Sequence, residues 1–291
     1  MSSITGDPIW TELGPGYCQV QFASLKQFVD YLYGDLLDFG TYVWRGQRCD
    51  SWRLDPTIDR LIRDADTSHA QSWDFRIQHL DTFKRATRGR RNSQTPAPTD
   101  ENEWWALGQH HGLATPLLDW TSSPFVAAFF AFAELAADQT PNRAVFALHQ
   151  PGVEGMAKLA RLEEDERRKT RREQLKAEGK STGLLEWATI SAKAESEVVF
   201  VRPQSDDNHR LVAQGGLFTR SRTNLSIEEW VMKRQPKDDN GLTLLKCLVP
   251  DIDRSRCLQL LNRMNINPLS LFPDLTGASR YCNLHSEIEN Y

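Results

Sequence analysis

Residues 104–133, WWALGQHHGLATPLLDWTSSPFVAAFFAFA, predict the centre of the fold and hold most of the candidate functional groups. Within it, the segment TSSP (residues 121–124) is typical of a helix start. A hydroxyl can cap the first turn, and proline fits the first helical position because it has no N–H to satisfy there. The residues from Pro124 to about Ala137 are apolar on nearly all sides. We therefore expect a buried core helix with polar residues delivered to its start.

Asp119 is the one acid in this stretch, and it stands between Leu118 and Trp120. A carboxylate with such neighbours is expected to be buried, and a buried carboxylate needs hydrogen-bond donors. The histidines at 110 and 111 cannot both face the same way, so we expect one in the core and the other at a pocket. Neither has a cysteine or carboxylate at ligand spacing, so no metal site is predicted.

Length and composition set broad limits on the class of protein. The chain has 291 residues, 40% of them hydrophobic, and a net charge of −4, which is compatible with one large domain and shows no global preference for nucleic acid. The five cysteines are widely spaced and form no CxxC pair, as is typical of a reducing compartment. No apolar run approaches about 18 residues, and the start has no signal-like pattern. We expect a cytoplasmic protein without a membrane partner.

The remaining pattern predicts an α+β fold. Strands are expected at 41–47, 143–150, 195–203, 209–219 and 244–250, and helices at 24–37, 52–62, 73–87, 154–179 and 255–264. Strands and helices alternate irregularly, and no phosphate-binding glycine loop occurs. We expect a mixed, largely antiparallel central sheet with surrounding helices. In domain terms, residues 1–21 are an N-terminal extension, and residues 22–291 form a single domain with a charged helical insertion near 154–180.

Two charged segments each have two interpretations. The cations Lys84, Arg85, Arg88, Arg90 and Arg91 follow one another without an acid, so they either contact phosphates or form a solvated helix end favoured by the helix dipole. The insertion places acids four residues before bases at Glu163/Arg167, Glu164/Arg168 and Asp165/Lys169. Such pairs add about 0.2–0.5 kcal/mol each and are typical of an exposed helix, so the insertion is either a surface segment or a helix that binds a partner.

Several short motifs together resemble the FRG domain family, which is named for an aromatic-Arg-Gly tripeptide. The tripeptide stands here as Trp44-Arg45-Gly46, and the likeness continues through QHHGL (109–113), LLDWT (117–121), RLVAQGGLFT (210–219) and LFPDL (271–275). It covers about residues 22–285. The chain departs at 114–116, with Ala-Thr-Pro where the family usually has Pro-Thr-Arg. The family likeness by itself assigns no reaction.

The order of polar motifs is also similar to the Arg/Ser/Glu class of ADP-ribosyltransferases. Arg45, the hydroxyl triplet at 121–123 and the pair Glu195/Glu197 occur in the order of that class. The resemblance implies an ADP-ribosyltransferase-like fold, NAD as co-substrate, and an acceptor that is left open between nucleic acid and protein. A toxin or defence effector is the setting it suggests. Cleavage of the nicotinamide–ribose bond develops oxocarbenium-like charge that a carboxylate stabilises, and a guanidinium suits the diphosphate.

The resemblance assigns candidate residues to this chemistry. The catalytic candidates are Glu197, Arg45 and Ser122. The candidates for binding NAD are Arg45, Gly46, His110, His111, Asp119, Thr121, Ser123 and Gln214. The absence of a Cβ at Gly46 would let a ligand or another chain approach closely.

Each assignment has a structural alternative. Arg45 can neutralise Asp119, the serines at 122 and 123 can serve as helix caps, and Glu195 and Glu197 can form a solvent-facing pair. Gln214 is either a hydrogen-bonding residue at a sheet bulge or a pocket residue. A different class of function therefore stands beside the enzyme: a non-catalytic module that binds a nucleotide or nucleic acid.

Overall fold

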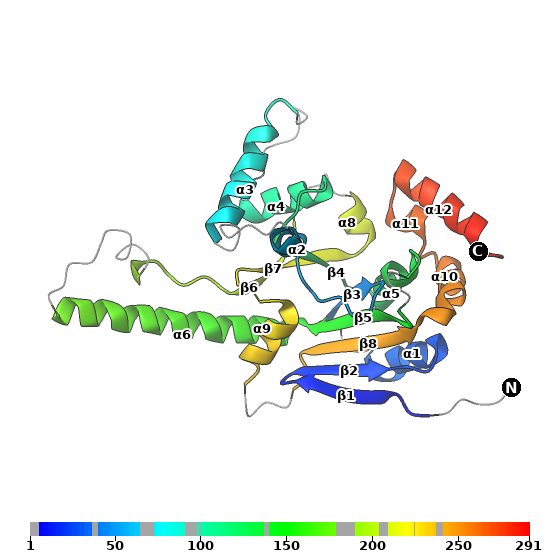
Figure 1. Cartoon of the computed structure of the whole chain (residues 1–291), viewed down its shortest axis with the longest axis horizontal. Helices are drawn as coiled ribbons and strands as arrows, with labels where there is room; N and C mark the ends of the chain where they lie inside the picture. The colour runs from blue at the N-terminus through cyan, green and yellow to red at the C-terminus, as the bar shows by residue number, and fades with distance from the viewer. Residues whose placement is uncertain are drawn as a thin grey trace.

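The computed structural model describes residues 6–36, 40–64, 73–90, 98, 100–136, 140–178, 190–203, 209–223, 225–236 and 241–291. An eight-stranded sheet lies at its centre, with the strand order β1-β2-β8-β5-β3-β4-β7-β6 (Figure 1). Neighbouring strands are antiparallel except for β2 and β8. The strands are β1 Ile9–Gly14, β2 Tyr17–Gln21, β3 Tyr42–Gln47, β4 Leu117–Thr121, β5 Asn142–His149, β6 Val198–Val201, β7 Gly216–Ser221 and β8 Leu244–Pro250. The predicted mixed, largely antiparallel sheet is confirmed.

Helices surround this sheet. They are α1 Leu25–Tyr31, α2 Thr57–Asp64, α3 Trp73–Ala86, α4 Glu101–His110, α5 Pro124–Phe132, α6 Gln150–Ala177, α8 His209–Ala213, α9 Ile227–Arg234, α10 Arg254–Arg263, α11 Pro268–Leu271 and α12 Leu275–Glu287. A π-helical turn, Leu32–Leu36, continues α1, and a 3-10 turn, Asp251–Asp253, precedes α10. The first strands, β1 and β2, join the sheet through β8, so residues 9–21 form its edge.

Strand β5 separates two cores. Residues 144–148 have no exposed surface, and their side chains alternate between the two faces of the sheet. Val145 and Ala147 pack with α1, α5 and α10 on one face, and Phe146 and Leu148 pack with α6 and α9 on the other. A strand that is buried on both faces reads as a continuous apolar run, as AVFAL does here.

Helix α5 is the core helix that the central stretch predicts. The Ser123 hydroxyl accepts a hydrogen bond from the backbone N–H of Val126 at 3.3 Å, and Pro124 occupies the first turn, so the predicted cap is confirmed. The helix ends at Phe132, earlier than the expected Ala137, because arginines take up its last carbonyls. Arg143 donates to the Ala131 carbonyl at 2.9 Å, and Arg254 donates to the Phe132 carbonyl at 2.9 Å.

The expected strand at 209–219 is wrong in its first half. Residues 209–213 form helix α8, and β7 begins only at Gly216. Two distant contacts favour the helix: Arg210 pairs with Asp274 at the start of α12, and the side-chain amide of Gln214 donates to the Leu271 carbonyl at 3.1 Å. Gly215, with φ of +55°, then turns the chain into the strand.

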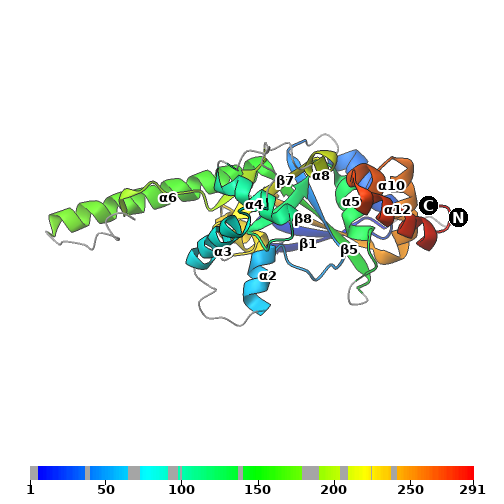
Figure 2. The same cartoon turned by 90° about the horizontal axis from the view of Figure 1, so that it is seen from above.

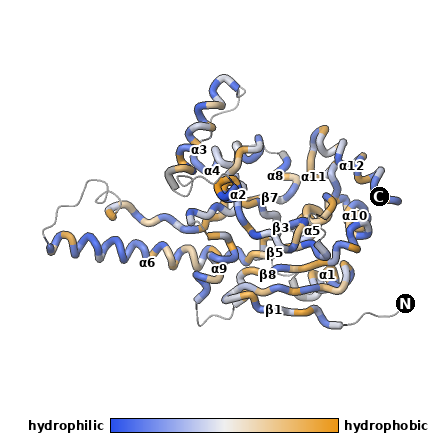
Figure 3. The backbone as a smooth tube through the Cα atoms, in the orientation of Figure 1, coloured by the Kyte–Doolittle hydropathy of each residue, from blue (hydrophilic) through white to orange (hydrophobic). Residues whose placement is uncertain are grey.

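Helix α6 confirms the predicted charged helix and extends away from the sheet (Figures 1 and 2). Its outer turns are hydrophilic (Figure 3). Arg167 lies 3.7 Å from Glu163, and Arg168 lies 2.9 Å from Glu164, as predicted. The third predicted pair is not formed: Lys169 contacts Glu166 at 3.3 Å, because the Asp165 carboxylate accepts a hydrogen bond from the backbone N–H of Ala194.

Gly46 is required by the contact between β3 and α5. A Cβ at this position would lie 1.9 Å from the Ala127 carbonyl oxygen and 2.6 Å from the Ala131 nitrogen. The close approach that the sequence predicted at Gly46 is therefore made by the backbone of α5.

Gly46→Ala should lower the free energy of unfolding by about 3 kcal/mol, at the upper end of overpacking effects, because a helix backbone cannot turn away as a side chain can. Gly155→Ala in α6 is the matched control, since a Cβ there meets nothing within 4 Å. It should be neutral or stabilise the chain by up to about 1 kcal/mol. Denaturant unfolding followed by circular dichroism measures both, and a Gly46→Ala variant as stable as the wild type would disprove the close packing.

Candidate functional site

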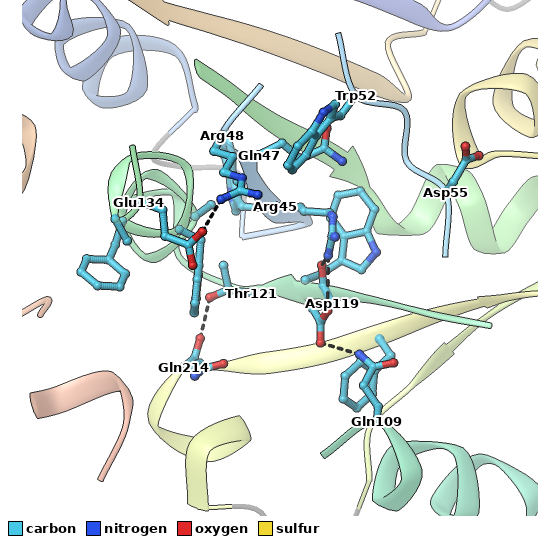
Figure 4. A pocket seen from close by; sticks show the side chains of 18 of the residues that line it. Arg45, Gln47, Arg48, Trp52, Asp55, Gln109, Asp119, Thr121, Glu134 and Gln214 are labelled. Carbon is cyan, nitrogen blue, oxygen red and sulfur yellow. Dashed lines mark hydrogen bonds and ion pairs between the residues drawn. The ribbon is translucent and has the colours of Figure 1, made fainter. Parts of the chain in front are cut away.

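A pocket opens where the sheet divides. Strands β3 and β4 pair at one position only, Trp44 with Thr121, whereas β3 pairs with β5 along its whole length. Past that pair, β3 and β4 form opposite walls of a cavity of about 990 Å³, with further walls from α2, α4, α5, α8 and α12 (Figure 4). Residues from α4, β4 and α5, all within the stretch at 104–133, thus meet the Trp-Arg-Gly strand at this fork.

Arg45 spans the fork. Its Nη1 donates to the backbone carbonyl of Asp119 at 2.8 Å and lies 3.4 Å from a carboxylate oxygen of the same residue. Burial lowers the pKa of the Arg45 guanidinium; Asp119 opposes this effect and the nearby Arg60 adds to it. The Nε of Arg45 is a buried donor without a partner among the described residues. Arg45 therefore contributes both to the sheet and to the pocket wall.

The expected burial of Asp119 is wrong. Its side chain is 65% exposed and faces the pocket, where the side-chain amide of Gln109 donates to Oδ1 at 2.7 Å (Figure 4). The apolar neighbours that suggested burial point to the opposite face of β4, because successive side chains of a strand alternate. The expected hydrogen-bond donors are present, and the predicted pairing of Arg45 with Asp119 is confirmed.

The pocket carries an excess of positive charge. It is lined by seven arginines and four carboxylates: the arginines are Arg45, Arg48, Arg53, Arg60, Arg63, Arg210 and Arg280, and the acids are Asp55, Asp64, Asp119 and Glu134. Two acids outside the lining, Glu229 and Asp274, pair with Arg53 and Arg210, so the excess is one cation. Five of the arginines form an ion pair with a carboxylate. Within the described parts of the chain, Arg60 on α2 and Arg280 on α12 have no carboxylate partner.

Aromatic rings form part of the same walls. The Arg48 guanidinium lies 5.0 Å from the ring centre of Trp52. Phe272 is contacted by Arg280 at 4.7 Å and by Arg210 at 5.7 Å. These cation–π contacts hold the guanidinium groups in place and leave flat apolar surface beside them.

Most of the predicted ligand-binding residues line the pocket, and some of them also form hydrogen bonds that stabilise the fold. Thr121 donates its hydroxyl hydrogen to the Gln214 carbonyl at 2.6 Å and accepts from the Ser123 N–H at 3.1 Å. Gly46, His110 and Gln214 also line the cavity. Ser122, Ser123 and His111 are not among its lining residues: Ser123 caps α5, and the Ser122 N–H donates to the Gly215 carbonyl at 3.0 Å.

Glu197 does not lie in this pocket. It lines a separate hollow of about 500 Å³ with Glu195, and its carboxylate accepts hydrogen bonds from Arg234 and, at 2.8 Å, from the indole N–H of Trp230. Burial alone would raise the pKa of Glu197, but these hydrogen bonds outweigh it and hold the pKa below its usual value. The expected meeting of Glu197 with Arg45 is therefore corrected: Glu197 joins β6 to α9. Glu195 pairs with Arg222.

Sequence reasoning missed Gln109, Arg60, Arg280 and Trp52 as pocket residues. Gln109 belongs to the QHHGL motif (109–113), and its position next to His110 could have indicated that it lines the pocket. The two arginines lie on helices distant in sequence, and nothing local distinguishes them from other exposed arginines. Only the packing of α2 and α12 around the fork brings them to the pocket.

The described parts of the chain contain neither a membrane-spanning helix nor a metal-binding cluster. No helix there has the length and apolar character that crossing a bilayer requires. No cluster of three or more His, Cys, Asp or Glu side chains is arranged there to hold a metal ion.

The comparisons with known proteins support the family likeness. Residues 40–140 match the FRG domain family model. Comparison with curated proteins and with solved structures gives no match. The matched region contains β3, α2, α4, β4 and α5, and therefore both sides of the fork. It does not include Arg210, Gln214 or Arg280, which complete the pocket from later in the chain.

Glu197→Gln should lower the free energy of unfolding at neutral pH by about 1–3 kcal/mol, since charge-assisted hydrogen bonds to Arg234 and Trp230 are weakened. A carboxylate with a depressed folded pKa stabilises the fold above its unfolded pKa and loses this effect as the pH falls through the folded value. The difference between wild type and variant should therefore shrink below the ordinary glutamate value of 4.5.

Glu166→Gln is the control for this prediction, because its pair with Lys169 is exposed. It should change stability by less than about 0.5 kcal/mol. Urea unfolding at several pH values measures both variants. Equal stability of Glu197→Gln and wild type at neutral pH would contradict the structural role.

Proposed function

We propose that the pocket at the fork binds a nucleotide, with its phosphates on the arginines and a planar ring against the aromatic wall. The observation that carries the proposal is the convergence of seven arginines with Trp52 and Phe272 around one cavity. Guanidinium groups bind phosphate oxygens through paired hydrogen bonds, and aromatic faces accept a base or a nicotinamide.

Arg60 and Arg280 are the main phosphate candidates. They reach the cavity from different helices and are not engaged by a carboxylate within the described residues. The other five arginines are already oriented by acids, which makes them less available but preorganised. Two unpaired cations on different walls favour a ligand with more than one anionic group.

The size of the cavity favours a dinucleotide over a free phosphate. A volume of about 990 Å³ lies at the upper end of the range of about 300–1,000 Å³ for small-ligand pockets. NAD, which the resemblance to ADP-ribosyltransferases implies, has two phosphates and two planar rings and matches these requirements.

Titration calorimetry with NAD and ADP tests the binding. Arg280→Ala and Arg60→Ala should each weaken the affinity by roughly 10- to 100-fold, the range expected for one lost charge-assisted contact. Arg256→Ala, an exposed arginine on α10 outside the pocket, is the control and should leave the affinity unchanged. Absence of wild-type binding at millimolar concentrations, or an equal loss in the control, would reject the proposal.

Asp119 gives a reason to consider turnover as a second function. Its carboxylate faces the cavity and is oriented by Gln109 and Arg45, as a group that stabilises oxocarbenium-like charge must be. In such a reaction the nicotinamide leaves with the electron pair of its bond to ribose, and an acceptor nucleophile bonds to the ribose carbon and loses a proton. We propose Asp119 in place of Glu197 as the candidate carboxylate.

Measurement of nicotinamide release from NAD separates the two functions. If the chain turns NAD over, Asp119→Asn should lower the rate by at least about 100-fold, because electrostatic stabilisation of this kind is worth that much. Glu197→Gln should retain the rate at a temperature where it is folded. Binding of NAD without release supports the non-catalytic module, and loss of release in Glu197→Gln alone would reject Asp119.

A further inference from the structure

A second basic groove lies at the end of α3, outside the pocket. This α3 groove has a volume of about 540 Å³ and is lined by Asp81, Lys84, Arg85, Thr87, Arg88, Gly89 and, from α4, Trp104. It contains most of the described part of the basic run that the sequence singled out; Arg91 lies outside the described residues. Three cations face one carboxylate, and Lys84 lies 3.4 Å from that carboxylate.

The simplest explanation of such a run is that it caps the helix. The last carbonyls of α3 are, however, already satisfied by groups other than Arg85 and Arg88. The Thr87 hydroxyl donates to the Lys84 carbonyl at 2.8 Å, and Arg90 donates to the Ala86 carbonyl at 2.8 Å. Backbone N–H groups donate to the carbonyls of residues 83, 85 and 87. The side chains of Arg85 and Arg88 are therefore not needed as caps.

The guanidinium groups of Arg85 and Arg88 are available to a ligand. Both residues are exposed. Arg85 reaches only the hydroxyl of Thr82, at 3.3 Å, and Arg88 has no side-chain partner among the residues that the structure describes. Arg85 lies in the last turn of α3 and Arg88 stands in the turn that follows, and both line the same groove, so the two groups can contact neighbouring anions of one ligand.

Trp104 adds an aromatic surface to the same groove. It is half-buried and packs edge-to-face against Phe83, with ring centres 6.4 Å apart. Arginines beside a tryptophan in a groove match the chemistry of a single nucleic-acid strand, whose phosphates take the cations and whose bases stack on the ring. A single small anion has no planar group that could stack on the ring of Trp104.

We propose that the α3 groove binds single-stranded nucleic acid. This inference does not rest on nucleotide binding in the pocket. The two sites are joined by α4, which carries Trp104 in the groove and Gln109 and His110 at the pocket. At 1.5 Å per residue these positions lie about 8 Å apart along the helix axis, and they point to different sides of α4, so the groove and the pocket are neighbouring but separate sites.

Fluorescence anisotropy with labelled single-stranded DNA and RNA of about 12 nucleotides, over a series of salt concentrations, tests the proposal. Arg85→Ala/Arg88→Ala should weaken binding at least tenfold at low salt. The slope of log K against log salt should fall in magnitude by about 1.4, because each lost phosphate contact on a single strand contributes about 0.7.

The matched control is Lys158→Ala/Arg161→Ala on α6, which also removes two exposed cations three residues apart. It should leave both the affinity and the slope unchanged. Binding of RNA, DNA or both supports the proposal. It is overturned if the wild type binds neither strand at low salt, if the control loses affinity equally, or if duplex DNA binds as tightly as a single strand.

The same variants distinguish this inference from the nucleotide pocket. Arg85→Ala/Arg88→Ala should keep the wild-type affinity for ADP, and Arg280→Ala should keep the wild-type affinity for the strand. Loss of both activities in either variant would mean that the groove and the pocket form one site, and would overturn the assignment of a separate strand-binding groove.

Discussion

The structure depends on the hydrogen bond between the Arg45 guanidinium and the backbone carbonyl of Asp119. Strands β3 and β4 pair only at Trp44 and Thr121. Beyond that pair, the Arg45 side chain donates the hydrogen bond to the Asp119 carbonyl that a backbone N–H would donate in a continuous sheet. The sheet therefore stays joined while its strands separate. A cavity with polar walls results, and a cation already stands at its base.

The same hydrogen bond explains why the three residues of the aromatic-Arg-Gly tripeptide depend on one another. Side chains alternate along β3, so Trp44 and Gly46 face α5 while Arg45 faces the fork. Trp44 fills the core, and the absence of a Cβ at Gly46 lets α5 lie directly on the strand. The position of α5 in turn fixes the end of β4 through the Ser123 cap, and β4 carries Asp119. The packing of α5 on β3 thus helps to set the geometry of the site.

Local chemistry made the fold largely predictable, whereas the site needed contacts between distant residues. The cap at Ser123, the strand at β3 and the long α6 follow from neighbouring residues alone, and each was predicted. The helix at 209–213 was missed because its stability comes from Asp274 and Leu271, more than fifty residues away. Glu197 was misplaced because the order of motifs along a chain does not determine which side chains meet; Arg234 and Trp230 hold it elsewhere.

The carboxylates of the pocket do not oppose the binding of an anion as strongly as their number suggests. Asp119 and Glu134 are 65% and 60% exposed, so their pairs with Arg45 and Arg48 are screened by water and are individually weak. In the proposed complex a phosphate can replace Glu134 on Arg48, and Glu134 then turns towards solvent at little cost. Gln109, by contrast, keeps Asp119 facing the cavity. Until that exchange, the acids hold the guanidinium groups in fixed positions, and less side-chain entropy is lost when a ligand binds. In this way a chain with a net charge of −4 can gather guanidinium groups at the proposed ligand site without exposing a row of unpaired cations.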